Sequence, residues 1–137
     1  MYFNVRSLLP KIDNLRILCS VYSPDIICVV ESWLDVDILD CEISVQGYSV
    51  IRLDRCRHGG GVLMYVKAVF TSLLLFKGST DFECIVISIL CTTSGTSPDL
   101  TIALFYRPPN SSPDWKRLHQ GKSGTTPLQI LVLSPIT

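Results

Sequence analysis

The strongest constraint on the fold is a run of five apolar residues, Ile26 to Val30, which follows Pro24-Asp25 and ends at Glu31. A short apolar run bounded in this way is typical of a strand that is buried on both faces of a sheet. Open α/β sheets keep their chemistry at the carboxyl ends of such strands, so Glu31 is a candidate metal ligand. A glutamate also ends many strands simply because the chain returns to water there, and both interpretations stay open.

Length and charge limit what Glu31 can belong to. The chain has 137 residues, which is enough for one domain with a real core. Lys plus Arg and Asp plus Glu number 12 each, so any nucleic-acid partner would need a local basic patch. Hydrophobic residues make up 47% of the chain, yet no apolar stretch approaches the roughly 18 residues of a membrane span. We therefore expect a globular interior and no membrane partner.

The cysteines indicate a reducing compartment. They form no CxxC pair and have no histidine at zinc-like spacing, and most lie in apolar runs, as expected for reduced core thiols. The first residues also lack the basic and apolar segments of a secretory signal. We expect an intracellular protein of the nucleus or cytoplasm. The six positions are Cys19, Cys28, Cys41, Cys56, Cys84 and Cys91.

Periodicity predicts one helix and about six strands. Ser7 is expected to cap a helix whose apolar face runs to Tyr22, through Leu8, Ile12, Leu15 and Leu18. Besides the run ending at Glu31, β-branched and aromatic segments predict strands over 48–53, 61–67, 70–76, 82–91 and 100–106. This order indicates an α/β (α+β) fold. Residues 119–137 are interpreted as an unrelated tail, in which a linker-like stretch precedes a short apolar segment without a place in the pattern.

Two local motifs allow both a structural and a functional interpretation. Gly59-Gly60-Gly61 precedes a predicted strand rather than a helix, which favours a turn with close backbone approach over a phosphate-binding loop. Tyr106-Arg107-Pro108-Pro109-Asn110 closes a strand with a stiff turn that presents a phenol, a guanidinium and an amide. Turn chemistry alone accounts for the prolines and the asparagine, so function stays open here.

Taken in order, these segments resemble one family. Their order and approximate spacing are similar to those of the endonuclease/exonuclease/phosphatase superfamily, most closely the apurinic-type endonuclease domain of LINE-like (non-LTR) retrotransposons. The resemblance covers residues 2 to 118, and residues 1–118 are interpreted as the partial domain. The segments are Asn4-Val5-Arg6-Ser7-Leu8, Pro24-Asp25-Ile26-Ile27 with Glu31-Ser32-Trp33-Leu34, Gly47-Tyr48, Arg52-Leu53-Asp54-Arg55, Gly59-Gly60-Gly61-Val62 and Tyr106-Arg107-Pro108-Pro109-Asn110.

The resemblance implies a Mg²⁺-dependent phosphodiesterase that nicks DNA to prime reverse transcription. Its partners would be DNA and the reverse transcriptase domain of the parent polyprotein. Glu31 would ligate Mg²⁺, Asn4 would lie beside the metal, and Tyr106 would contact the scissile phosphate. A hard cation with oxygen ligands polarises phosphoryl oxygens, while a phenol and amides stabilise the developing charge.

Other residues of the matching motifs have less direct roles. Asn110 is a candidate catalytic residue, although it lies one position later than in the wider superfamily pattern. The resemblance makes Arg52, Arg55 and Arg107 candidate phosphate contacts, with a solvated surface as the alternative for each.

The chain also departs from the family pattern. After the turn at Tyr106 it has neither the Gly-Asp-Phe-Asn nor the Ser-Asp-His segment, and its only histidines are His58 and His119. The resemblance therefore implies only the N-terminal half of a four-layer α/β sandwich, with a second sheet missing and apolar strands left uncovered. It also implies half an active site, with weak or absent Mg²⁺ binding and no cleavage by this chain alone.

Three alternative functions remain. Inositol-phosphate phosphatases and sphingomyelinases belong to the same superfamily, although the segments around Arg52 and Tyr106 favour DNA. A non-catalytic nucleic-acid-binding or interaction remnant would keep the arginines and would not need a histidine. A non-functional relic of a decayed element would also suit the tail after Gly121.

Overall fold

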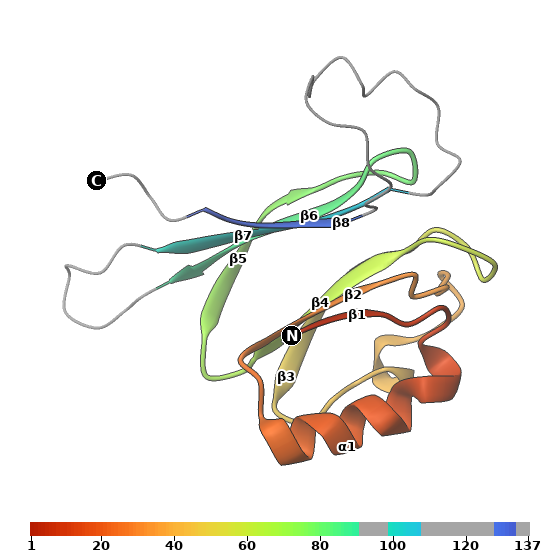
Figure 1. The fold of residues 1–137 in the computed structure, drawn as a ribbon, viewed down its shortest axis with the longest axis horizontal. Helices are drawn as coiled ribbons and strands as arrows, with labels where there is room; N and C mark the ends of the chain where they lie inside the picture. Colours follow the sequence, from red (N-terminus) through yellow and green to blue (C-terminus); the bar gives the residue numbers. More distant parts are fainter. Residues whose placement is uncertain (91–98, 108–127, 134–137) are drawn as a thin grey trace.

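Two four-stranded sheets and one long helix form the fold (Figure 1). The computed structural model describes residues 1–90 and 99–107 and the backbone of residues 128–133. The α+β class predicted from the sequence is confirmed. In chain order the elements are β1 (Tyr2–Asn4), η1 (Leu9–Lys11), α1 (Ile12–Tyr22), β2 (Ile26–Val30), η2 (Asp40–Glu42), β3 (Tyr48–Leu53), β4 (Val62–Lys67), β5 (Thr71–Lys77), β6 (Glu83–Leu90), β7 (Leu100–Tyr106) and β8 (Leu128–Leu133).

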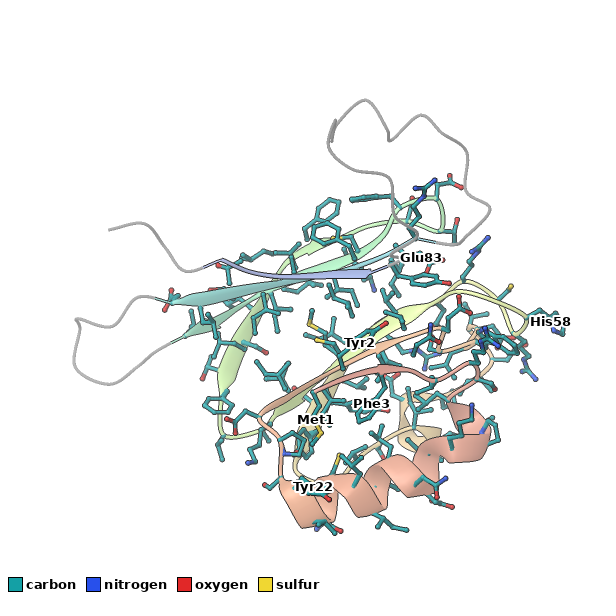
Figure 2. The ribbon with its side chains drawn as sticks, viewed as in Figure 1. Met1, Tyr2, Phe3, Tyr22, His58 and Glu83 are labelled. Atoms are coloured by element: carbon teal, nitrogen blue, oxygen red, sulfur yellow. The ribbon has the colours of Figure 1, made fainter. Side chains whose placement is uncertain are left out.

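The first sheet has the strand order β1-β2-β4-β3, with α1 covering one face. β1 and β2 are parallel, while β4 is antiparallel to both β2 and β3. The apolar run of β2 is buried on both faces, as the sequence predicts. Ile27 and Val29 pack on the helix side, and Cys28 and Val30 pack on the opposite side. Figure 2 shows the same alternation in β1, with Phe3 toward α1 and Tyr2 toward the second sheet.

The helix begins later than its sequence pattern suggests. Ser7 has a left-handed backbone with a φ of 78°, so it cannot lead directly into a helix, and η1 fills the gap before α1. The prediction that Ser7 caps the helix is therefore wrong. Tyr22 is 67% exposed, because the buried stripe runs through Ile12, Leu15 and Cys19 instead of continuing to Tyr22. The helix ends at Ser23, whose left-handed φ precedes Pro24.

A second sheet is present, contrary to the expectation of uncovered strands. It has the order β5-β6-β7-β8, with every neighbouring pair antiparallel. The expectation failed because the strands assigned to one sheet divide between two, and β5 leads from the first into the second. β8 also pairs with β7, so part of the apolar segment after Gly121 extends this sheet.

The two sheets pack face to face through an inter-sheet cluster of buried apolar side chains. Each such side chain contributes about 1.5–3 kcal/mol when it is fully buried. The cluster therefore fixes the position of one sheet on the other. Its buried members are Cys28, Val30, Val62, Met64, Val66, Ile85, Ile87, Ile89, Ile102, Leu104 and Tyr106.

Across the described part of the chain, none of the helices has the length and apolar character needed to span a membrane. The cysteines that the structure describes are all free thiols. Burial raises the pKa of the Cys28 and Cys84 thiols to about 11, so both stay protonated core groups at neutral pH.

Candidate functional site at the meeting edge of the two sheets

The parallel pairing of β1 and β2 brings Asn4 and Glu31 to one end of the first sheet. Asn4 is in register with Val30, the residue before Glu31. The chain continues the pairing beyond the strands, since the Val5 amide donates to Val30 O at 3.1 Å and the Ser7 amide donates to Glu31 O at 2.9 Å. Both candidate residues therefore lie at the carboxyl end of their strands, while the roles predicted for them stay predictions.

Glu31 begins a sharp turn that leaves the strand. Its φ is 57° and that of Trp33 is 54°, both in the left-handed region that favours glycine. The turn is held by two backbone bonds, from the Ser32 amide to Gly61 O at 3.2 Å and from the Trp33 amide to Gly60 O at 3.0 Å. Because these bonds fix the backbone, the Glu31 side chain leaves the strict alternation of β2 and reaches the loop before β4.

One oxygen of the Glu31 carboxylate is already occupied. Glu31 Oε2 accepts a hydrogen bond from Trp33 Nε1 at 2.6 Å and a longer one from the Gly60 amide at 3.4 Å. Glu31 Oε1 accepts no hydrogen bond from any residue that the structure describes. The half-buried carboxylate thus offers one oxygen to a ligand.

Gly60 and Gly61 form a tight turn that leads into β4 with a close backbone approach, as the sequence indicates. Both have positive φ values, 68° and 86°. A methyl group at Gly61 would lie 2.3 Å from Ser32 Oγ, and one at Gly60 would lie 2.4 Å from Arg55 Cδ. At Gly61 glycine therefore allows the loop before β4 to approach the turn at Glu31 so closely.

A second carboxylate at this edge, Glu83, is not apparent from the sequence. It begins β6 and is 2% exposed (Figure 2). The Gly61 amide donates to Glu83 Oε2 at 2.8 Å, and Arg55 Nη1 lies 3.5 Å from Glu83 Oε1. Glu83 Oε1 has no hydrogen-bond partner among the described residues. The signal that could have found Glu83 is a charged residue at the start of an otherwise apolar strand.

Burial and charge act together on the titratable groups of this edge. Burial raises the pKa of Glu83, and the nearby Glu31 charge adds to the shift, while the Gly61 amide and Arg55 oppose it. Burial likewise raises the pKa of Tyr2, and the nearby Cys28 and Glu31 side chains raise that pKa further. Glu31 therefore acts electrostatically both on Tyr2 of β1 and on Glu83 of the second sheet.

Tyr106 belongs to the same end of the molecule. It ends β7 directly opposite Glu83 in the antiparallel register and is 6% exposed. Arg107 follows it and is partly exposed. Asn110 lies outside the described residues. The predicted phenol is thus brought to the edge that holds Glu31 and Glu83.

The arginines predicted to contact phosphates differ in their surroundings. Arg52 is held by Asp54 at 2.6 Å and Asp40 at 3.0 Å, and it also donates to Ile38 O and Asp35 O. These contacts use all of its guanidinium nitrogens and tie the loop before β3 to Asp54, which follows β3. Arg55 has a side chain that is 37% exposed and faces Glu83. Arg55 is therefore better placed than Arg52 to meet a phosphate, and both roles stay predictions.

Oxygen ligands at this edge suit a hydrated Mg²⁺ ion. The Glu31 carboxylate and the exposed Asn4 amide are both hard donors, and Mg²⁺ commonly keeps several waters while it uses one or two carboxylates. The described residues contain no group of three or more His, Cys, Asp or Glu side chains that could enclose a metal. A Mg²⁺ ion at Glu31 and Asn4 therefore stays a prediction, and it would be an open site and not a closed metal cage.

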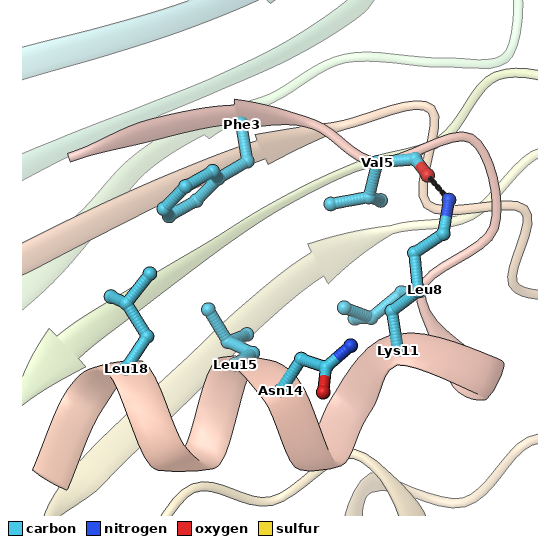
Figure 3. Close-up of a pocket in the computed structure, with 7 residues that line it drawn as sticks. All are labelled: Phe3, Val5, Leu8, Lys11, Asn14, Leu15 and Leu18. Atoms are coloured by element: carbon cyan, nitrogen blue, oxygen red, sulfur yellow. Dashed lines mark hydrogen bonds between the residues drawn. The ribbon is translucent and has the colours of Figure 1, made fainter.

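A separate hollow lies on the other face of the first sheet (Figure 3). Its lining comes from β1 and the residue after it, Phe3 and Val5, and from the helical segment, including Leu15. Lys11 bridges its rim by donating to the backbone oxygen of Val5. The lining is mainly apolar and carries no carboxylate, so this hollow is not part of the edge at Glu31.

Comparison with known proteins supports the fold. No protein-family model matches the chain, and no curated protein matches it. The crystal structure of AP endonuclease LMAP from Leishmania major is similar, with a TM-score of 0.52 and 22% sequence identity. The alignment covers 72% of this chain and 36% of that chain. The two-sheet α+β fold is therefore similar to that of an AP endonuclease.

Proposed function

We propose that this chain is part of a divalent-cation-dependent DNA endonuclease of the kind that non-LTR retrotransposons use to nick target DNA. The observation that carries the proposal is the Glu31 carboxylate at the carboxyl end of β2, next to the strand end that carries Asn4, with Oε1 available to a ligand. The similarity of the fold to an AP endonuclease supports it. The proposed protein partner is the reverse transcriptase domain of the parent polyprotein.

Each residue has a defined part in this proposal. Glu31 and Asn4 would hold Mg²⁺, which when bound would stabilise charge on the phosphoryl oxygens. Tyr106 would meet the scissile phosphate from the second sheet, opposite Glu83. Arg55 and Arg107 would contact flanking phosphates, because both are at least partly exposed at this edge.

Among the residues that the structure describes at this edge, there is no histidine to act as a general base for a nucleophile. A positioned general base contributes typically ~10²–10⁴-fold to such reactions, and alignment of the nucleophile contributes more. His58 is exposed in the loop between β3 and β4, and His119 lies outside the described residues. We therefore expect these 137 residues alone to bind phosphodiester substrates without cleaving them at a measurable rate.

The first test is nicking of supercoiled plasmid in Mg²⁺ by the purified chain. We expect no nicking above that of the Glu31→Ala variant. Nicking by the wild type that Glu31→Ala abolishes, with an unchanged circular dichroism spectrum, would show that the site is complete. His58→Ala and His119→Ala would then identify the base.

The second test is Mg²⁺ binding by calorimetry. One carboxylate with one available oxygen should bind Mg²⁺ weakly, with a dissociation constant in the millimolar range. The binding should be lost in Glu31→Gln. Tight binding that depends on Glu31 would contradict the proposed open site, and DNA binding without any Mg²⁺ binding would favour a nucleic-acid-binding remnant.

A further inference from the structure

Trp33 contacts the candidate metal carboxylate directly, although nothing in the proposed chemistry uses it. Its Nε1 donates to Glu31 Oε2 at 2.6 Å, the shortest side-chain contact of that carboxylate. Trp33 is half-buried and is not part of either apolar core cluster. Its position is therefore not accounted for by core packing alone.

The turn that joins the two residues directs the indole back to the carboxylate. Glu31 and Trp33 both have left-handed φ values, with the fully buried Ser32 between them. Backbone bonds from Ser32 and Trp33 to Gly61 and Gly60 hold this conformation. Strained conformations of this kind persist only where the surroundings fix them, and they concentrate at ligand sites.

We propose that Trp33 is a positioning residue, whose indole N–H holds Glu31 Oε2 so that Glu31 Oε1 is presented to a divalent cation. This inference rests on the proposed function, because it requires a cation at Glu31. The Gly60 amide donates to the same Oε2, so two donors occupy one oxygen and leave the other as a monodentate ligand. Partners that orient a metal ligand typically change metal affinity by 10–100-fold.

The experiment measures Mn²⁺ binding to the full chain by the loss of the free Mn²⁺ signal in electron paramagnetic resonance. Three forms are compared with the wild type: Trp33→Phe, Glu31→Gln and a chain in which benzothienylalanine replaces Trp33. Benzothienylalanine keeps the shape of tryptophan but has sulfur in place of the N–H group. Trp115→Phe is the matched control, because it removes the other tryptophan of the sequence.

We expect the dissociation constant for Mn²⁺ to rise about tenfold or more in both Trp33 forms. It should be unchanged in Trp115→Phe, and Glu31→Gln should abolish saturable binding. If Trp33→Phe does not fold, as judged by circular dichroism, the benzothienylalanine chain alone tests the role of the indole N–H group. A wild-type dissociation constant in that chain would overturn the role of the N–H group and leave the proposed cation site intact.

A second readout places the cation near the indole. In the Trp115→Phe background Trp33 is the single tryptophan, so it should sensitise Tb³⁺ luminescence that excess Mg²⁺ competes away. Sensitised emission that persists in Glu31→Gln would overturn the inference by placing the cation elsewhere. Absence of Glu31-dependent binding of either Mn²⁺ or Tb³⁺ in the wild type would overturn both this inference and the proposed function.

Discussion

The two sheets of this molecule differ in how completely they are covered. The first sheet packs against α1 on one face and the second sheet on the other, and its strand β4 is buried from Val62 to Val66. In the second sheet, β5 lies at the edge, and its residues Leu73 to Phe76 are about half exposed, from 49% to 55%. Strands of similar apolar composition therefore occupy very different surroundings, because neighbouring elements and not composition decide burial.

The candidate site lies where these two unequal sheets meet. The first, well-covered sheet supplies Glu31, while the second, less covered sheet supplies Glu83 and Tyr106. The Gly61 amide, just before β4, donates to Glu83 of β6 and so connects the two sheets. The site consequently depends on the docking of the two sheets. Four experiments with substituted chains can sharpen or contradict this comparison.

The largest difference is expected between two leucines of the two sheets. Leu63→Ala removes a fully buried side chain from β4 and should lower the free energy of unfolding by about 2–5 kcal/mol. Leu75→Ala changes a residue that is 55% exposed at the bulge of β5 and should cost about 0.5 kcal/mol or less. Urea unfolding measures both. Similar losses in the two variants would contradict the difference in coverage.

A smaller loss is expected at the turn that joins the sheets. Gly61→Ala places a methyl group against Ser32 Oγ at a residue with positive φ, and should lower the free energy of unfolding by about 1–3 kcal/mol. Gly59→Ala is the control, because it meets no atom within 4 Å. Equal stability of the two variants would show that the close approach of Gly61 is not required.

Glu83 should make the docking of the sheets dependent on pH. Burial raises its pKa in the folded state, so the native state binds the proton more tightly than the unfolded chain, whose pKa is about 4.3. The Glu83 contribution to stability is therefore complete below that value and is lost as the pH rises through the folded pKa. Relative to Glu83→Gln, the wild type should lose stability over this interval in urea unfolding. A wild type that instead gains stability relative to Glu83→Gln as the pH rises would give the opposite sign and refute the assignment.

A small effect on stability is also expected on the outer face of the second sheet. Leu73 and Phe76 are in register with Ser88 and Val86, on the face opposite the inter-sheet cluster. The double substitution Leu73→Thr and Phe76→Thr keeps β-forming residues and should change stability by about 0.5 kcal/mol per site. The double substitution should also reduce self-association, because exposed apolar edge strands favour association between copies. Sedimentation velocity measures this. Unchanged association would show that this face is not adhesive.

Local patterns in the sequence predicted the elements that local contacts determine. The apolar run before Glu31 became β2, and the strands over 48–53 and 100–106 have the predicted bounds. The sequence also predicted the end of the sheet at which Glu31 lies, because this charged residue directly follows the apolar run. The functional roles of Glu31 and Asn4 remain predictions, because no ligand contact tests them.

Contacts between distant segments explain what the sequence did not predict. The Glu83 carboxylate is held at the site by the Gly61 amide, which lies 22 residues away in the sequence. The second sheet was not expected, because the division of the strands between two sheets depends on the path of β5 and on long-range pairing and not on any local pattern. The ion pairs of Arg52 with Asp40 and Asp54 also depend on the folded chain, while its role as a phosphate contact stays a prediction. The wrong cap at Ser7 reflects a left-handed backbone that is set by its bond to Glu31 O.

The bond between the Gly61 amide and Glu83 Oε2 has a consequence for hydrogen exchange. Its donor is a backbone N–H group in a loop, where exchange with solvent is ordinarily fast, yet its acceptor lies on the other sheet and is almost fully buried. Exchange at Gly61 must then wait for a separation of the sheets. A single amide resonance therefore reports how often the edge that holds Glu31 opens to water.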